Sequence, residues 1–148
     1  GCGMRGFTLR AVEDDSIDYV ERVLERSDLP TGDLRSSPTR LYVGRHGGAR
    51  VGVGGLELYG PDALLRSVAV EPSVRGRGFG TAICDRLERN ARSADVETLY
   101  LLTTAEADFF AGLGYVEIDR ENAPTSIRET TEFAELCPST ATCMQKSL

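Results

Sequence analysis

Residues 67–81 read SVAVEPSVRGRGFGT, and this stretch decides the fold. The apolar residues before Pro72 predict a strand, because proline ends regular strand pairing, and a helical pattern begins after Gly78. The loop between them holds glycines at positions 76, 78 and 80 and arginines at 75 and 77. Alternate glycines let backbone N–H groups turn inward around an anion, and the helix start adds unpaired N–H groups and a positive dipole end. The stretch therefore predicts a diphosphate site between a strand and a helix.

Two common phosphate-binding loops do not fit this spacing. The P-loop of ATP-binding proteins has a Lys after its last glycine, and no Lys follows here. The glycines also do not match the G-x-G-x-x-G pattern of dinucleotide-binding folds. The competing interpretation is a tight structural turn with two solvated arginines, and the strand before it, the helix after it and both arginines together argue against that.

Outward from this stretch, hydrophobic periodicity and turn residues predict further strands and helices. The predicted strands span 7–12, 40–45, 50–59, 64–71, 96–102, 115–118 and 130–133, and the predicted helices span 14–27, 78–93 and 103–113, with one helical turn at 124–129. Asp14 or Asp15 can cap the first helix, and Thr103 with Glu106 forms a capping box for the third. This order predicts a mixed α/β sheet in one domain.

Length and composition limit the class of protein. The chain has 148 residues, which suits one domain, and we interpret residues 1–3 as a cloning remnant before a domain at 4–148. The net charge of −6 argues against a nucleic-acid partner, which needs a basic face, and no apolar run is long enough for a membrane helix. A single His46 among four cysteines offers no zinc set, so we expect no metal. Cysteines without a secretion signal suggest a reducing cytoplasm.

Three motifs together resemble the GNAT superfamily of acetyl-CoA-dependent N-acetyltransferases. Arg75, Gly78 and Gly80 match its loop pattern [QR]-x-x-G-x-[GA], and both Val68-Ala69-Val70 and the segment ADFFAGLGY at 107–115 are similar to the family. The resemblance covers residues 5–133 in element order. It implies a mixed, mostly antiparallel sheet with helices on both faces, in which the parallel strands 64–71 and 96–102 splay apart to hold acetyl-CoA. The tail at 120–144 resembles, more narrowly, the arsenic-resistance-associated N-acetyltransferases.

The resemblance also implies which residues hold the acetyl donor. The pantetheine arm is expected along the strand, the pyrophosphate on the N–H groups of the glycine loop, and the adenosine outside, near the start of the Gly78 helix. The expected donor-binding residues are Val68, Ala69, Val70, Arg75, Gly76, Arg77, Gly78, Phe79, Gly80 and Thr81, flanked by Thr103, Thr104, Phe109 and Phe110.

The expected reaction is direct attack of a neutral amine on the thioester carbonyl. A backbone N–H of the Val68–Val70 strand, taken as that of Val70, is expected to stabilise the oxyanion. Glu57 is our candidate base, acting through a water; the competing interpretation is a surface Glu near the strand end. Glu71 is a weaker candidate. Arg66 shares a strand face with Val68 and is our candidate for binding a substrate carboxylate, against the alternative of a salt-bridged or edge-exposed Arg.

Several points stay open at this stage. Phe110 stands where the family often has a Tyr that protonates the leaving thiolate; Tyr100 and Tyr115 are candidate donors, although packing explains both more simply. Cys137 and Cys143 could bind a trivalent arsenical, or be inert buried thiols.

We expect the acceptor to be a small amino-acid-like amine, with a link to arsenic resistance. Alternatives are acetylation of peptide N-termini, or a regulatory protein that binds acetyl-CoA without catalysis. We expect a monomer or homodimer, with no nucleic acid and no membrane as partner.

Overall fold

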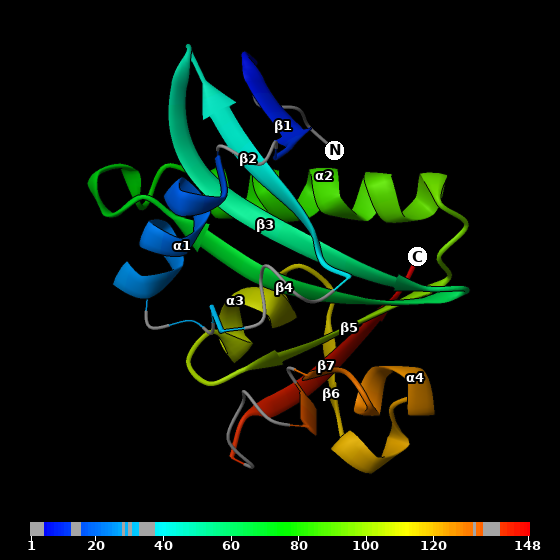
Figure 1. Ribbon diagram of the computed structural model, residues 1–148. Helices are drawn as coiled ribbons and strands as arrows, with labels where there is room; N and C mark the ends of the chain where they lie inside the picture. The colour runs from blue at the N-terminus through cyan, green and yellow to red at the C-terminus, as the bar shows by residue number, and fades with distance from the viewer. Residues whose placement is uncertain are drawn as a thin grey trace.

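The strand and the helix on either side of the glycine loop are β4 (Asp62–Val70) and α2 (Phe79–Ser93). They come from a computed structural model, which describes residues 5–12, 16–27, 29, 31–32, 38–131, 133–134 and 140–148. The other elements are β1 (Phe7–Ala11), α1 (Ile17–Arg26), β2 (Arg40–His46), β3 (Ala49–Tyr59), η2 (Pro72–Val74), β5 (Thr98–Thr103), α3 (Ala107–Gly112), β6 (Val116–Ile118), η3 (Arg120–Asn122), α4 (Thr125–Arg128) and β7 (Thr142–Ser147). They are labelled in Figure 1.

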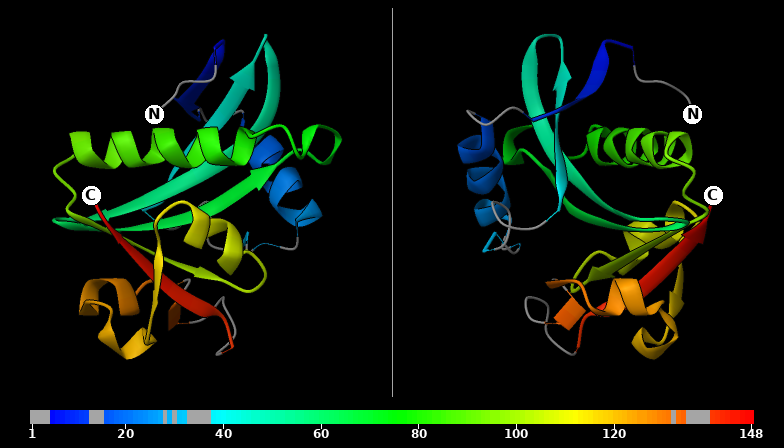
Figure 2. Two further views of the ribbon diagram at one scale, coloured as in Figure 1. Left: turned by 180° about the vertical axis from the view of Figure 1, so that it is seen from behind. Right: turned by 45° about the vertical axis from the view of Figure 1, so that its right-hand side comes forward.

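The described strands form one sheet of seven, in the order β1-β2-β3-β4-β5-β7-β6. Only β4 and β5 run parallel; every other neighbouring pair is antiparallel. Helix α1 covers one face of the β3–β4 region and α2 crosses the other face, as the two views in Figure 2 show. The predicted fold, a mostly antiparallel mixed sheet with one central parallel pair and helices on both faces, is confirmed.

Two glycines let α2 lie directly on β3. A Cβ placed on Gly52 would come within 2.8 Å of Ile83 Cδ1, and one on Gly54 within 2.7 Å of Leu87 Cδ1. Ile83 and Leu87 of α2 are both fully buried. A larger residue at either glycine of β3 would therefore push the helix off the sheet. On the opposite face Val20, Val23 and Leu24 of α1 are equally buried.

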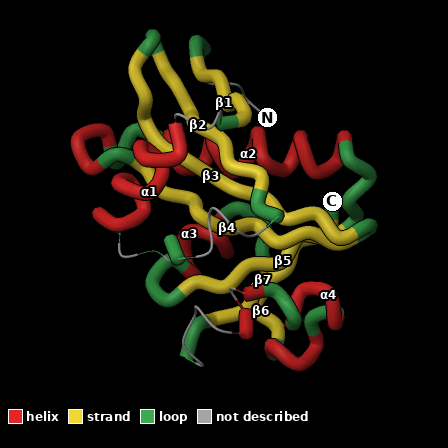
Figure 3. Tube along the Cα trace, in the orientation of Figure 1, coloured by secondary structure: helices red, strands yellow, loops and turns green. Residues whose placement is uncertain are grey.

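The parallel strands β4 and β5 separate soon after they begin. They pair only over Asp62–Leu64 and Thr98–Tyr100, after which β5 continues to pair with β7 alone. Strand β4 stays with β3, but between Arg66 and Ala69 it carries one residue more than its partner. Ser67 in this bulge has φ +60°, a left-handed conformation that non-glycine residues seldom adopt. The sheet therefore opens into a V on the carboxyl side of Leu64 (Figure 3).

The prediction for the C-terminal tail is wrong in part. The predicted strand at 130–133 does not form: Thr130 lies in a bend, and its hydroxyl donates to the Ile127 carbonyl at 2.7 Å while accepting from the Phe133 N–H at 3.3 Å. Such local side-chain bonds to the backbone compete with strand pairing. The last strand is instead β7, which we did not predict and which lies between β5 and β6.

The observed start of helix α3 also differs from the predicted one. Helix α3 begins at Ala107 rather than at residue 103, because Thr103 is still the last residue of β5. Its hydroxyl nevertheless accepts the Glu106 N–H at 2.9 Å, which is half of the predicted capping box. The predicted caps Asp14 and Asp15 lie outside the described residues. None of the described helices is both long and apolar enough to cross a membrane.

Candidate active site

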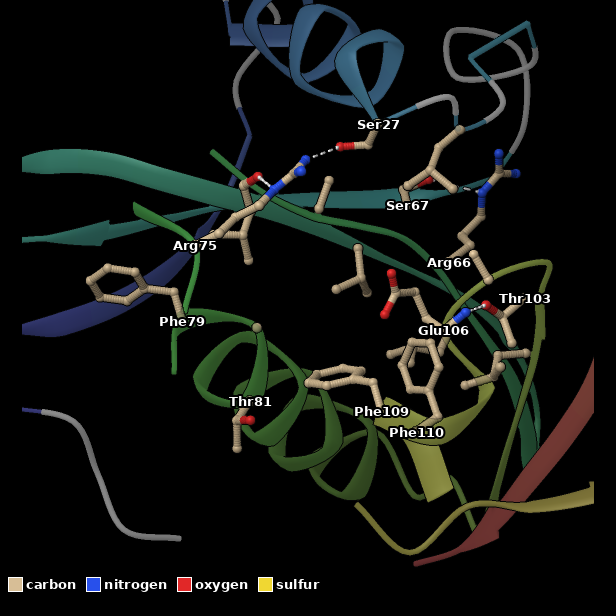
Figure 4. Close-up of a pocket in the computed structure, with 18 of the residues that line it drawn as sticks. Ser27, Arg66, Ser67, Arg75, Phe79, Thr81, Thr103, Glu106, Phe109 and Phe110 are labelled. Atoms are coloured by element: carbon tan, nitrogen blue, oxygen red, sulfur yellow. Dashed lines mark hydrogen bonds between the residues drawn. The ribbon is translucent and has the colours of Figure 1, made fainter. Parts of the chain in front are cut away.

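The V between β4 and β5 opens into a pocket of about 1050 Å³. Its walls come from both strands, the glycine loop, the first turn of α2, helix α3 and the end of α1 (Figure 4). Most residues predicted for the site line it together: Arg66, Val68, Ala69, Val70, Arg75, Gly76, Gly78, Phe79, Gly80, Thr81, Thr103, Thr104, Phe109 and Phe110. Arg77 and Glu57 are not among the lining residues, nor are the weaker candidates Glu71, Tyr100 and Tyr115.

The glycine loop presents backbone rather than side chains to the pocket. Gly76 and Gly78 have φ of +83° and +86°, which glycine adopts without strain. Gly78 is the N-cap of α2 and offers no capping side chain, and no acidic residue occupies the first turn. A Cβ on Gly80 would lie 3.3 Å from Phe109 Cζ, so α2 and α3 meet closely here. The N–H groups at the start of this 15-residue helix are thus suited to an anion.

Two arginines frame the mouth of the pocket. The Arg75 guanidinium donates to Ser27 Oγ at 3.2 Å and to the Val70 carbonyl at 3.4 Å, so it joins the loop to the end of α1. Figure 4 shows this link across the pocket from Phe109 and Phe110. Arg26 in α1 also lines the pocket and pairs with Glu71 at 3.1 Å.

Glu71, the weaker candidate base, is engaged at this mouth. One of its carboxylate oxygens accepts from the Tyr19 hydroxyl at 2.9 Å and the other from Arg26. Burial and the hydrogen bond to Glu71 raise the pKa of Tyr19 above its ordinary range, so Tyr19 stays a neutral donor. Glu71 therefore ties α1 to the end of β4.

The candidate base and the candidate carboxylate-binding residue form a buried ion pair. Arg66 Nη1 lies 2.8 Å from Glu57 Oε2, and the two side chains are 0% and 2% exposed. Thr39 donates to the same carboxylate at 2.9 Å, and Tyr59 donates to its other oxygen. The interpretation of Glu57 as a surface residue is therefore wrong. The alternative of a salt-bridged Arg66 is confirmed.

Phe109 and Phe110 form the apolar wall that faces the strands. Their rings pack edge to face with centroids 5.1 Å apart. Neither candidate tyrosine lines the pocket. Tyr115 donates to Glu88 at 3.2 Å in the core, and burial, with the nearby Glu88 charge, raises its pKa; Tyr100 packs with Ile127. The packing interpretation holds for both.

Nine lining residues were missed by sequence reasoning, and four of them are polar or charged: Arg26, Ser27, Ser67 and Glu106. The first two come from α1, far away in sequence, so no local pattern could reveal them. Ser67 and Glu106 lie inside the quoted motifs, where attention to side-chain hydroxyls and carboxylates would have found them. Figure 4 shows the Glu106 carboxylate directed toward the middle of the pocket.

The described cysteines are buried away from the pocket. Cys84 and Cys143 are free thiols, and burial raises their pKa to about 12 and about 11. A thiol with so high a pKa is a poor nucleophile and metal ligand at neutral pH. Cys137 lies outside the described residues. No group of three or more His, Cys, Asp or Glu in the described ranges is arranged to hold a metal ion.

Residues 37–117 match the family model described as an acetyltransferase (GNAT) domain. The chain belongs to this family. The chain is also 34% identical over 125 residues to a Mycobacterium tuberculosis protein named amino-acid acetyltransferase, an alignment that covers 82% of this chain and 67% of that one. The predicted family resemblance is confirmed, whereas the narrower arsenic-resistance branch is not shown.

Solved structures of the same fold superpose over nearly the whole chain. N-acetylglutamate synthase from Neisseria gonorrhoeae, complexed with coenzyme A and N-acetyl-glutamate, has a TM-score of 0.82 at 16% identity over 99% of this chain. This chain spans only 36% of that protein. Rv2747 from M. tuberculosis, in complex with CoA and NLQ, has a TM-score of 0.77 at 23% identity and covers 95% of this chain and 99% of its own.

Proposed function

We propose that this GNAT domain transfers the acetyl group of acetyl-CoA to the primary amine of a small amino-acid-like molecule. The observation that carries the proposal is the V between β4 and β5, which ends at an uncapped helix start with left-handed glycines. The name of the M. tuberculosis relative supports an amino-acid acceptor, and two structural neighbours are complexed with CoA.

We expect the donor to enter the pocket in one direction. Its diphosphate would bind the N–H groups of residues 75–81, with Arg75 beside it and the exposed Arg77 at the outer rim. The pantetheine would follow Val68–Val70 into the V against Phe109 and Phe110. The thioester would then lie along β4, where the N–H of Val70, at the open end of the V, is one candidate for the oxyanion contact.

In this reaction Glu57 would accept the amine proton through a water. The carboxylate does not line the pocket, and Arg66 stands between it and the cavity. A water chain past Arg66 would therefore have to carry the proton. Arg66 would contact a substrate carboxylate if its guanidinium, which is 0% exposed beside Glu57, turned toward the pocket, and the carboxylate would then share the guanidinium with Glu57.

The test is a panel of amines read by release of free CoA. An amino acid should be acetylated faster than its own amide, because the amide lacks the carboxylate that Arg66 binds. Arg66→Lys should narrow this difference, since a lysine cannot hold a carboxylate and Glu57 in a bidentate manner. Equal rates on the acid and the amide would remove the support for an amino-acid acceptor, and absence of any CoA release would remove the enzyme itself.

Two further parts of the proposal concern arsenic resistance and cellular location. The link to arsenic resistance rests on the tail, whose Cys137 lies outside the described residues. The cytoplasmic location is supported by two buried thiols, Cys84 and Cys143, that stay unpaired. Preference for peptide N-termini would appear in the same amine panel as faster acetylation of a tripeptide than of its first amino acid.

A further inference from the structure

Ser67 lies in the wall of the pocket with a left-handed backbone, at φ +60°. It is one of two non-glycine residues with positive φ in the described part of the chain, the other being Asp95. It lies three residues beyond Leu64, where β4 and β5 last pair, and inside the bulge that shifts β4 against β3. Strained backbone of this kind is found mainly where the surrounding structure needs a group in one position.

The surroundings of Ser67 fix its hydroxyl. Arg66 Nε donates to Ser67 Oγ at 3.1 Å, and Arg66 is itself held by Glu57 at 2.8 Å. Within the described residues Arg66 is the one hydrogen-bond partner of the Ser67 side chain. A hydroxyl that accepts from a guanidinium must point its own hydrogen elsewhere, and the positive charge polarises that O–H bond. Ser67 lines the pocket, so a bound molecule can receive this hydrogen bond.

We propose that the Ser67 hydroxyl donates a hydrogen bond to the thioester carbonyl oxygen of the acetyl donor. This rests on the proposed function. The amine nitrogen bonds to the carbonyl carbon and the C=O electron pair moves to oxygen, where Ser67 stabilises the negative charge without giving up its proton. The electron pair on the oxygen then re-forms the C=O bond as the C–S bond breaks, the C–S electron pair leaves with the sulfur as the CoA thiolate, and the amine proton passes to solvent or to Glu57. Arg66 is a positioning residue in this scheme, and Glu57 positions Arg66.

The proposal also fits the lack of a tyrosine in the described pocket wall. Phe109 and Phe110 carry no donor, and Tyr100 and Tyr115 are turned into the core. Successive strand residues advance about 3.3 Å, so a hydroxyl at position 67 reaches an acetyl group level with Val68 and not one level with Val70. The proposal therefore requires the acetyl group to lie level with Val68.

Isotope-edited infrared spectroscopy of bound acetyl-CoA tests this without an acceptor. Acetyl-CoA labelled with ¹³C at the carbonyl should show a lower stretching frequency on the wild-type protein than on Ser67→Gly. Glycine is the chosen replacement because it accepts φ +60° and removes only the hydroxyl and Cβ. Asp95→Gly is the matched control: it frees the backbone at the other left-handed residue, away from the pocket, and should leave the frequency at the wild-type value.

Kinetics with any amine that the panel identifies give the second measurement. Ser67→Gly should lower kcat by about 10²–10³-fold, the effect of losing one oxyanion donor, with the Kd for acetyl-CoA within about threefold of wild type. An identical carbonyl frequency in wild type and Ser67→Gly, or an unchanged kcat, overturns the role of Ser67 while the acetyltransferase activity stands. Failure of the wild type to bind acetyl-CoA overturns the proposed function instead.

Discussion

At the scale of single residues, the buried pair Glu57–Arg66 dominates the site. Removing one partner leaves the other charge buried, which typically destabilises a protein by about 3–5 kcal/mol, whereas an apolar pair of similar size is often neutral. We therefore expect Glu57→Leu and Arg66→Met each to lower the free energy of unfolding by about 3–5 kcal/mol. The double variant should recover most of that loss. Urea unfolding of all four proteins measures the cycle, and additive losses in the double variant would contradict the pairing.

The proton-transfer role of Glu57 needs a different measurement. An α-amine with a pKa of about 8 is mostly protonated at neutral pH and mostly neutral at pH 10. If Glu57 relays the proton, Glu57→Gln should lower kcat/KM by about 10²-fold at pH 7 and by much less at pH 10, because the substrate then arrives neutral.

A suitable control for that profile is Thr39→Val, which removes one hydrogen bond to Glu57 and keeps its charge. This variant should show a small loss of kcat/KM with the pH dependence of the wild type. A loss in Glu57→Gln that is the same from pH 6 to pH 10 would mean that Glu57 only holds Arg66.

At the scale of elements, the strand-loop-helix unit is where sequence reasoning worked best. Residues 66–81 and 103–110 carry their signals locally, in glycine spacing, proline and a capping threonine, so nearly all of them were found. The contact of Glu57 with Arg66 was missed. The hairpin turn at Gly60 sets a register in which Arg66 pairs with Gly55. Glu57 lies two residues after Gly55 and therefore on the same face of β3, within reach of Arg66.

Strand β7 shows why the rest could not be predicted. Two consecutive residues of this strand, Cys143 and Met144, are both buried, at 2% and 3% exposure. The strand therefore lacks the alternation of buried and exposed residues that marks a half-buried strand. Its place between β5 and β6 is set by long-range pairing, and Lys146 secures it by donating to Glu88 and to the Leu113 carbonyl, at 2.8 and 2.7 Å. None of these partners is close to β7 in sequence.

The glycine loop is expected to bind the diphosphate of the donor, and a substitution in the loop tests this. Gly78→Asp puts a side chain at φ +86° and a carboxylate at the helix start, where the diphosphate should bind. We expect the Kd for acetyl-CoA to rise by at least about 100-fold in isothermal calorimetry, with native circular dichroism. Gly60→Asp is the matched control, because Gly60 has φ +68° with no atom within 4 Å of a built Cβ and does not line the pocket. Equal affinities in the two variants would separate the loop from donor binding.

At the scale of the whole molecule, the protein carries a net charge of −6, whereas arginines gather at the mouth of the pocket. The overall charge repels an anion such as coenzyme A at long range, whereas Arg26, Arg75 and Arg77 attract it locally. Salt screens exposed charges over about 10 Å at 0.1 M and about 3 Å at 1 M, so it should act on the long-range repulsion and on the exposed arginines alike. Because the arginines are nearest to the diphosphate, we expect the loss of attraction to exceed the loss of repulsion.

The consequence is a thermal stabilisation that depends on donor and salt together. A ligand at 100 times its Kd stabilises the folded state by about 2.7 kcal/mol. For a chain of this size that corresponds to a rise in Tm of roughly 5–11 °C. Acetyl-CoA should produce this rise at 0.1 M salt, and the same donor concentration should produce a smaller one at 1 M. Gly78→Asp should show almost no rise at either salt concentration. A rise that grows with salt would mean that long-range repulsion outweighs the three arginines, and an equal rise in Gly78→Asp would place the donor away from the uncapped start of α2.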